Sequence, residues 1–296
     1  MTAVVDPEHI NASTSVDSMA DKATAVAPYT FLDYRTANYY LATSEIDILE
    51  TKIQEIVAEI PDDSDVIELG CGSLRKTKIL LDALNRQRTG ITYYAIDVMP
   101  LPLHESMESL SPQLSNITFV ALCGTYEEVM SHFKKSTRRK TIIWLGSSIG
   151  NCTADEATAM LSGIVDDVLN KKDAIMIGMD LQKDCDYNGR QQTFFDVNRF
   201  KYVGEYDDKL GRHNAYIEAQ EDMILQWPQS VKSQVRDICG NADDLVLKCG
   251  DRIYIASSHK YGPSDANKLA CAIGLMHAAE WVDSREYYSL NLFRKP

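Results

Sequence analysis

The chain has 296 residues, enough for one large domain or two closely associated ones, and 45% hydrophobic with 25% charged residues is typical of globular proteins. Its formal net charge of −13 argues against a nucleic-acid partner, because binding to a phosphate backbone depends on a surplus of lysine and arginine. The basic run at 134–140 is interpreted as a solvated helix end, and no apolar run approaches membrane-spanning length, so no membrane partner is expected.

The cysteines and histidines indicate the redox state of the thiols and argue against a metal site. The seven cysteines are scattered and odd in number, no Cys-x-x-Cys pair occurs, and no signal-peptide pattern precedes them. Such usage is typical of reduced thiols and predicts a cytoplasmic protein. The six histidines lack the spacing of metal ligands, so we expect no metal site.

The first 60 residues divide into two parts. Residues 1–27 are rich in Ala, Ser, Thr, Asp and Val without periodicity, which predicts a disordered tail. Residues 28–60 form an N-terminal segment that we assign to the substrate side. The apolar spacing that follows Ser44 predicts a helix with this serine as its N-cap.

From residue 61 onward, strand-like and helical segments alternate. Short apolar runs predict strands at 66–69, 93–96, 117–122, 141–145 and 174–179. Helical spacing predicts helices at 76–85, 101–110, 126–133 and 154–169. This order predicts an α/β fold with a parallel sheet, as in Rossmann-like proteins.

The pattern changes after Asp184. Short alternating segments at 202–206, 214–222, 244–247 and 252–257 predict a smaller, mainly β lobe. A helical pattern at 265–275 precedes a strand pair, 278–282 and 286–292, that can rejoin the first sheet. We therefore predict a core at 61–184 and 262–296, and a substrate-binding lobe at 185–261.

The most informative stretch is Val-Ile-Glu-Leu-Gly-Cys-Gly-Ser at 66–73, where an apolar run ends in a Gly-x-Gly turn. Such a turn brings the backbone close to a ligand, because glycine has no Cβ. The third glycine of the dinucleotide fingerprint is missing, which argues against a nicotinamide oxidoreductase. Glu68 would repel a pyrophosphate but attract a cation. These features favour S-adenosylmethionine (SAM), with Glu68 and the turn near its methionine part.

A second acidic residue supports the same ligand. Asp97 ends the strand-like run 92–97, and a carboxylate in this position of a doubly wound sheet typically binds the ribose hydroxyls of an adenosine ligand. The alternative is an ordinary βαβ unit in which the glycines serve packing and Asp97 is a helix N-cap.

Between Tyr34 and Phe293 the chain resembles the fungal and bacterial N-methyltransferases that act on histidine, in the first step to ergothioneine, and on dimethylallyltryptophan. The similar segments are Tyr39-Tyr-Leu-Ala-Thr-Ser-Glu-Ile-Asp-Ile-Leu49, Glu68-Leu-Gly-Cys-Gly-Ser73 with Lys76-Thr77, Leu145-Gly-Ser-Ser-Ile-Gly-Asn151, Gly178-Met-Asp-Leu-Gln-Lys-Asp184 and Ser257-Ser-His-Lys-Tyr261. The phrases at 91–97 and 210–213 favour the fungal, tryptophan-type members.

The resemblance implies roles for individual positions. The donor-site positions are Gly70, Gly72, Ser73, Lys76 and Asp97, with Gly124 and Thr125 near the adenine. Tyr40 and Asn151 match positions that hold the amino and carboxylate end of the substrate, and Ser258 matches a contact to its side chain. Tyr34 and Tyr39 are candidates, with Tyr40, for shaping the nitrogen pocket. Tyr40 could instead pack a helix start, and Asn151 could be the N-cap of the helix at 154.

Two departures from the family pattern affect the acceptor. Histidine-specific members carry a glutamate two residues before the serine that matches Ser258, and here that position is Ala256. An alanine offers no acceptor to an imidazole N–H, so histidine should be a poor substrate. The segment 184–199 and the region before Tyr39 are shorter than usual, which predicts a more open pocket or one that a second copy of the chain completes.

The sequence therefore predicts a SAM-dependent N-methyltransferase for the aliphatic nitrogen of a small amino acid or amine, tryptophan-like rather than histidine. Its expected partner is this small-molecule substrate, and a homo-oligomer is one expectation. A non-catalytic SAM-binding subunit or regulator is the alternative from another class; it would bind SAM and methylate no amine.

Overall fold

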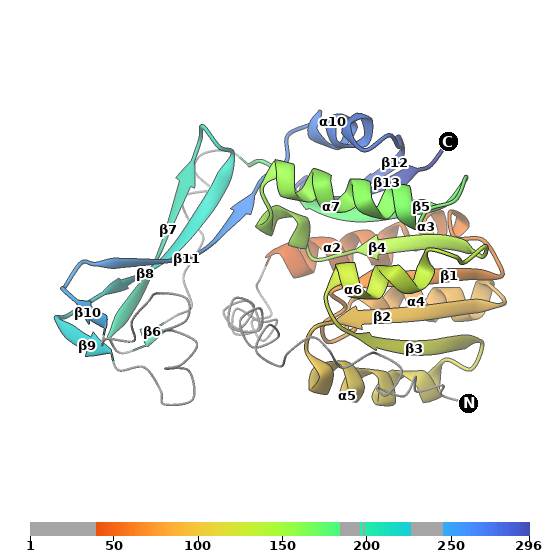
Figure 1. Ribbon diagram of the computed structural model, residues 1–296, viewed down its shortest axis with the longest axis horizontal. Coiled ribbons are helices and arrows are strands. Elements are labelled where there is room, and N and C mark those ends of the chain that lie inside the picture. The colour runs from red at the N-terminus through yellow and green to blue at the C-terminus, as the bar shows by residue number, and fades with distance from the viewer. Residues whose placement is uncertain (1–39, 184–195, 198, 226–244) are drawn as a thin grey trace. The chain divides into compact units, whose positions relative to one another are not determined.

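The computed structural model describes residues 40–183, 196–197, 199–225 and 245–296 (Figure 1). The described chain forms two compact units, one made of 40–182 with 259–296 and the other of 183–258. The predicted tail at 1–27, Tyr34 and Tyr39 lie outside the described residues. No helix within the described ranges is long and apolar enough to span a membrane.

A seven-stranded sheet organises the first unit, in the order β12-β13-β5-β4-β1-β2-β3. Its strands are β1 (Ser64–Leu69), β2 (Ile91–Asp97), β3 (Ile117–Cys123), β4 (Arg139–Trp144), β5 (Ala174–Asp180), β12 (Met276–Val282) and β13 (Tyr288–Arg294). The first five pair in parallel, whereas β13 is antiparallel to β5 and to β12. The predicted Rossmann-like core is confirmed, and the last strand pair does rejoin the sheet.

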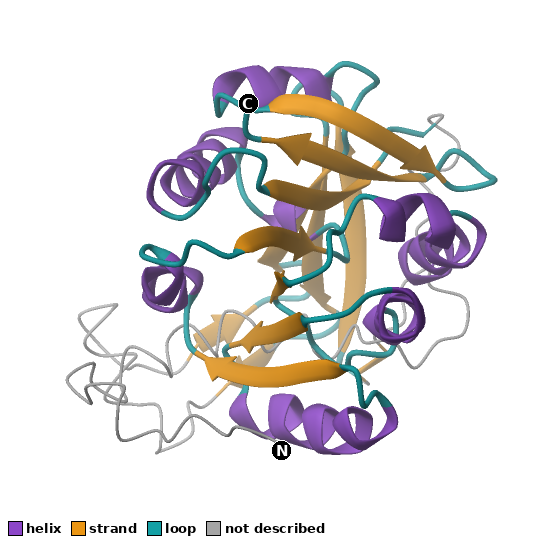
Figure 2. Ribbon diagram, turned by 90° about the vertical axis from the view of Figure 1, so that its right-hand side faces the viewer, coloured by secondary structure: helices purple, strands orange, loops and turns teal. Residues whose placement is uncertain are grey.

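Helices cover both faces of this sheet (Figure 2). They are α2 (Tyr40–Thr51), α3 (Ile53–Ala58), α4 (Thr77–Gln87), α5 (Pro100–Leu110), α6 (Tyr126–Met130), α7 (Ala154–Asp167) and α10 (Asp265–Ala272). Capping boxes start two of them, because Thr125 pairs with Glu128 at α6 and Thr153 with Glu156 at α7. Each box satisfies backbone N–H groups that the first helical turn leaves without a partner.

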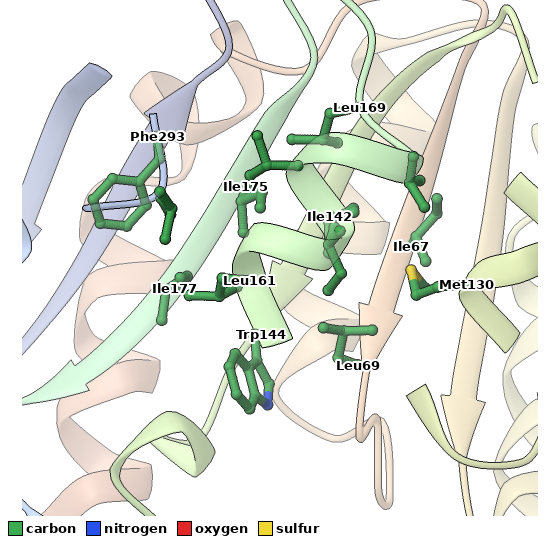
Figure 3. Close-up of a cluster of buried hydrophobic side chains, with 14 of the residues drawn as sticks. Ile67, Leu69, Met130, Ile142, Trp144, Leu161, Leu169, Ile175, Ile177 and Phe293 are labelled. Carbon is green, nitrogen blue, oxygen red and sulfur yellow. The ribbon is translucent and has the colours of Figure 1, made fainter. Parts of the chain in front are cut away.

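The core lies between this sheet and the helix α7 (Figure 3). Leu161 on the helix and Ile142, Ile175 and Ile177 on the central strands are completely buried. Central parallel strands are covered on both faces, which explains why β1 and β5 are continuous buried runs instead of alternating ones.

The helix predicted to begin after Ser44 begins earlier, at Tyr40. Ser44 is therefore not an N-cap but a buried residue inside α2, and its hydroxyl accepts a hydrogen bond from the Arg285 guanidinium at 2.9 Å. The helical segment also breaks at Lys52, which separates α2 from α3. The capping prediction failed because the helix already begins about one turn before Ser44.

The second unit, where it is described, consists of strands and their turns. A four-stranded sheet has the order β11-β8-β7-β6, and a two-stranded ribbon pairs β9 with β10. The strands are β6 (Asp196–Val197), β7 (Phe200–Asp207), β8 (Arg212–Ala219), β9 (Met223–Leu225), β10 (Leu245–Leu247) and β11 (Arg252–His259). Ala219, Met223 and Leu247 form its small buried cluster. The predicted mainly β lobe is present.

Candidate functional site

The Gly-x-Gly turn follows β1 and is pinned to the end of β2. The amides of Gly70 and Cys71 both donate to the carbonyl of Ile96, at 2.9 and 3.0 Å. Gly70 and Gly72 have φ values of +67° and +54°, which glycine adopts without strain. A Cβ on Gly70 would lie 2.8 Å from the Tyr126 hydroxyl, whereas a Cβ on Gly72 would meet no atom within 4 Å. Gly70 thus allows close packing, and Gly72 leaves open space beside its backbone.

Asp97 joins three of the segments predicted to hold the donor. Its carboxylate accepts the Gly72 amide and the Met99 amide, each at 3.0 Å, while its carbonyl accepts the Gly124 amide at 3.2 Å. The N-cap of the following helix α5 is Met99, so Asp97 is not the cap that the alternative interpretation required. Asp97 therefore fixes the strand ends at one edge of the sheet, where doubly wound proteins bind ligands.

The fit of an adenosine ligand can be judged from this carboxylate. A carboxylate offers about four acceptor positions, and the two backbone amides account for two of them. Further acceptor positions suit a pair of ribose hydroxyls. The open backbone at Gly72 adds a surface that a ligand can approach. These observations fit SAM.

Glu68 lies under the turn and is only 2% exposed. Its carboxylate accepts hydrogen bonds from Thr77, at 2.8 Å, and from the Tyr93 hydroxyl, so it ties β1 to the start of α4 and to β2. Burial raises the pKa of Glu68 to about 7, although these two hydrogen bonds and the Lys76 charge oppose the rise. The described contacts make Glu68 a support for the turn, and its proximity to a methionine moiety stays a prediction.

Lys76, another predicted donor residue, forms an ion pair with Glu45 of α2. The Glu45 side chain is completely buried, and it also accepts the Gly146 amide at 2.8 Å and the Tyr288 hydroxyl. Sequence analysis missed Glu45. The signal was available, since Glu45 lies at helical spacing within the buried stripe of Leu41, Ser44, Ile48 and Leu49.

Tyr40 is joined to a second buried charge pair. Its hydroxyl donates to Asp180 Oδ2 at 2.7 Å, and the Lys260 ammonium contacts the same oxygen at 2.5 Å. The Asp180 amide donates to Ser147 Oγ at 2.9 Å, and the Ser147 amide donates to the Tyr288 hydroxyl at 3.1 Å. A continuous series of polar contacts therefore links the Tyr40 side chain to Glu45 and Lys76. Neither Asp180 nor Lys260 was a predicted site residue.

Asn151 ends the short 3-10 turn Ser148–Asn151 and is exposed. The N-cap of α7 is Thr153, whose hydroxyl accepts the Glu156 amide, so the capping role considered for Asn151 is wrong. The turn is entered through Gly146 and Ser147, both with positive φ. The network around Glu45 and Asp180 holds this entry in place, because it bonds the amides of Gly146 and Ser147 and the Ser147 hydroxyl.

The remaining predicted residues are placed as follows. Ser73 belongs to the turn after Gly72, and Thr125 follows Gly124 as the cap of α6. Ala256 and Ser258 lie on β11, in the second unit, and Ala256 is 9% exposed. Asp97 thus forms direct hydrogen bonds with Gly72 and Gly124. Lys76 and Tyr40 are connected through the series of polar contacts described above.

The chain is similar to several known methyltransferases. The N-methyltransferase imqF of Aspergillus flavus is 37% identical over 281 residues, which cover 84% of this chain and 73% of that protein. Ergothioneine biosynthesis protein 1 of Neurospora crassa is 29% identical over 87% of this chain, but the chain spans only 30% of its length. A solved SAM-dependent methyltransferase from Clostridium acetobutylicum has a TM-score of 0.51 at 12% identity, covering 94% of this chain and 99% of that one, which shows the shared fold.

The family described as histidine-specific, SAM-dependent methyltransferases matches residues 33–187 and 186–295, nearly the whole chain. SAM is accordingly the cofactor, and the catalytic interpretation is favoured over a non-catalytic subunit. The resemblance inferred from the five sequence segments is confirmed. The chain belongs to this family of SAM-dependent methyltransferases.

Proposed function

We propose that the protein methylates the aliphatic nitrogen of a small amino acid or amine whose body is apolar or indole-like, and that histidine is a poor substrate. The observation that carries this proposal is Ala256, at the position where histidine-specific relatives carry a glutamate. An imidazole bound there would have no acceptor for its N–H. The unpaired N–H would weaken the binding of histidine relative to a substrate with an apolar body.

The donor side of the proposal rests on the turn and on Asp97. Asp97 would accept the ribose hydroxyls, Gly70, Gly72 and Ser73 would line the methionine part, and Gly124 and Thr125 would lie near the adenine. Lys76 provides a cation that Glu45 holds in place, suited to a ligand carboxylate. Bound SAM supplies an electrophilic methyl group, and the chain has to hold a neutral nitrogen in line with it.

The acceptor side rests on Tyr40 and Asn151. These residues would hold the amino and carboxylate end, while Ser258 and Ala256 would face the distal body of the substrate. Tyr34 and Tyr39 are further candidates from the sequence. Aromatic rings around the nitrogen would tolerate a methylated cation through cation–π attraction.

A panel assay tests the proposal. Purified protein is incubated with labelled SAM and single amino acids or amines, including tryptophan, dimethylallyltryptophan and histidine, and the products are identified by mass spectrometry. We expect label on the aliphatic nitrogen of an indole-type or apolar acceptor. Binding of SAM without transfer to any amine would instead favour the non-catalytic alternative, and efficient methylation of histidine would contradict the role given to Ala256.

Two further properties belong to this proposal. We expect the protein to act in the cytoplasm, since the five cysteines in the described ranges are all free thiols, as in a reducing compartment. A homo-oligomer is a second expectation, because the sequence at 184–199 is shorter than is usual in the family, which predicts either a more open pocket or one that a second copy completes. Light scattering of the purified protein distinguishes a monomer from such an assembly.

A further inference from the structure

The Asp180 carboxylate is a buried charge in direct contact with Tyr40, a residue of the proposed acceptor site. Its side chain is completely buried at the end of β5, and one oxygen, Oδ2, contacts both the Tyr40 hydroxyl and the Lys260 ammonium. The proposed function uses Tyr40 but gives no role to Asp180 or Lys260.

The direction of the Tyr40 hydrogen bond decides what Tyr40 can offer a ligand. A phenol has a single proton, and here that proton is donated to the Asp180 carboxylate at 2.7 Å. Towards any further partner, the phenol oxygen can then act only as an acceptor. An amine that contacts it must donate an N–H, which leaves the nitrogen lone pair to point elsewhere.

Lys260 pairs with Asp180 in this buried position. Burying a carboxylate is costly unless an opposite charge and hydrogen bonds compensate it. The Lys260 side chain is 4% exposed and balances the charge. Backbone hydrogen bonds hold the pair in register, from the Tyr261 amide to the Asp180 carbonyl at 2.8 Å and from the Gln182 amide to the Tyr261 carbonyl at 3.0 Å.

Asp180 is also bonded to the loop that contains Asn151. Its amide donates to the hydroxyl of Ser147, at the start of that loop. Ser147 has a φ of +55°, an uncommon conformation for a residue other than glycine, which such contacts stabilise. One residue of β5 therefore holds both segments that are assigned to the amino-acid end of the substrate.

We propose that Asp180, balanced by Lys260, is a positioning residue that fixes the Tyr40 hydroxyl as a hydrogen-bond acceptor for the N–H of the methyl acceptor. This inference rests on the proposed function, in which Tyr40 contacts the reacting nitrogen. Asp180 itself touches neither SAM nor the acceptor in this scheme and acts through Tyr40.

The test is a double-mutant comparison in the full chain. The pair is replaced together by apolar residues, Asp180→Leu/Lys260→Met, so that neither charge is left buried alone. The same change is made in a Tyr40→Phe background. We measure kcat and KM for the best acceptor of the panel at saturating SAM, SAM affinity by calorimetry, and thermal stability.

We expect the paired replacement to lower kcat/KM for the acceptor at least about tenfold with Tyr40 present, while SAM affinity changes less than about twofold. In the Tyr40→Phe background the replacement should cause little further loss, because its effect passes through the hydroxyl. An equal loss in both backgrounds, or no loss in either, overturns the inference and leaves the proposed function intact.

A second variant covers the case in which the apolar replacement does not fold. Asp180→Ala/Lys260→Met removes both charges and the acceptor of the Tyr40 hydroxyl with a smaller side chain at position 180, and the same dependence on Tyr40 is required of it. If the unmodified protein methylates no amine in the panel, the proposed function fails first and this inference falls with it. A loss confined to SAM affinity would assign the pair to the donor side and overturn the inference alone.

Discussion

At the residue scale, Asp97 organises the fold with the same carboxylate that we propose binds the ligand. Its carboxylate holds the amides of Gly72 and Met99, and its carbonyl holds the amide of Gly124. A residue that organises the turn also presents acceptors at the strand end. The contribution of Asp97 to binding should therefore include both direct hydrogen bonds and the order of the turn.

Replacing Asp97 by alanine should weaken SAM binding at least about tenfold, because hydrogen bonds to a charged acceptor contribute about 1.5–3 kcal/mol each. Isothermal titration calorimetry measures the effect. Asp97→Asn is the matched control, since its amide oxygen can still accept one hydroxyl, and it should lose less affinity. SAM affinity that is unchanged in the alanine variant would remove Asp97 from the donor site.

Glu68 predicts a pH dependence of stability. Burial raises its pKa from 4.5 to about 7, so the folded chain holds a proton that the unfolded chain releases between these values. The free energy of unfolding should therefore fall as pH rises from about 4.5 to about 7, by up to about 3 kcal/mol from this group. Below that window Glu68 is protonated in both states and contributes no slope.

Glu68→Gln should abolish this part of the pH dependence, because the amide is neutral and can still accept from Thr77 and donate to the Tyr93 oxygen. Urea denaturation at pH 5 and pH 8 gives the comparison. The variant should lose less stability than the unmodified protein between the two pH values. The same loss in both proteins would show that Glu68 is ionised throughout.

At the scale of elements, the sequence predicted the parallel core well, because alternating strands and helices leave periodic patterns of burial. The long helix α7 and the returning strands β12 and β13 fall close to the predicted positions. The polar network was not predictable in the same way. Tyr40 and Asp180 are 140 residues apart in the sequence. Periodicity indicates that a residue is buried, but it does not indicate which distant residue forms a hydrogen bond or ion pair with it.

Some contacts of the site could be predicted from the sequence and others could not, depending on how far apart the residues lie in the chain. The glycine turn and Asp97 form a local strand–turn pattern with known geometry, so their proximity could be inferred. Glu45 and Tyr288 come from α2 and β13 and meet only after the sheet is complete. The partner of the Ser44 hydroxyl, Arg285, likewise lies far away in the sequence.

The strand β5 contains a glycine whose replacement tests the network. A Cβ on Gly178 would lie 1.8 Å from the Tyr288 hydroxyl and 2.9 Å from Glu45 Oε1, so Gly178→Ala must displace the tyrosine. We expect a loss of about 1–3 kcal/mol in the free energy of unfolding. Gly163→Ala is the control: this α7 glycine has open space around it, and alanine should be neutral or stabilising there.

Chemical denaturation of both variants measures whether the alanine at position 178 destabilises the fold more than the alanine at position 163. Equal stability of the two alanine variants would mean that Tyr288 moves without cost and that its contacts to Glu45 and Ser147 do not support the site. A selective loss in Gly178→Ala, accompanied by weaker SAM binding, would show that the network supports the donor residue Lys76 as well as the fold.

At the scale of the whole molecule, the residues proposed to contact the substrate are distant in the sequence. Tyr40 and Asn151 belong to the sheet-containing unit, whereas Ala256 and Ser258 belong to the strand β11 of the other. The residues that we propose for the donor site all belong to the first unit.

Ala256→Glu should therefore change substrate preference without changing donor binding. The added carboxylate supplies an acceptor for an imidazole N–H, so kcat/KM for histidine should rise at least about tenfold, while that for the indole-type acceptor should fall because a charge enters its apolar surroundings. Ala256→Leu adds bulk without an acceptor and serves as the control, expected to leave histidine poor. The ratio of kcat/KM values for the two substrates, measured in direct competition, gives the answer. A glutamate variant whose ratio equals that of the unmodified protein would separate Ala256 from the acceptor pocket, whatever the acceptor proves to be.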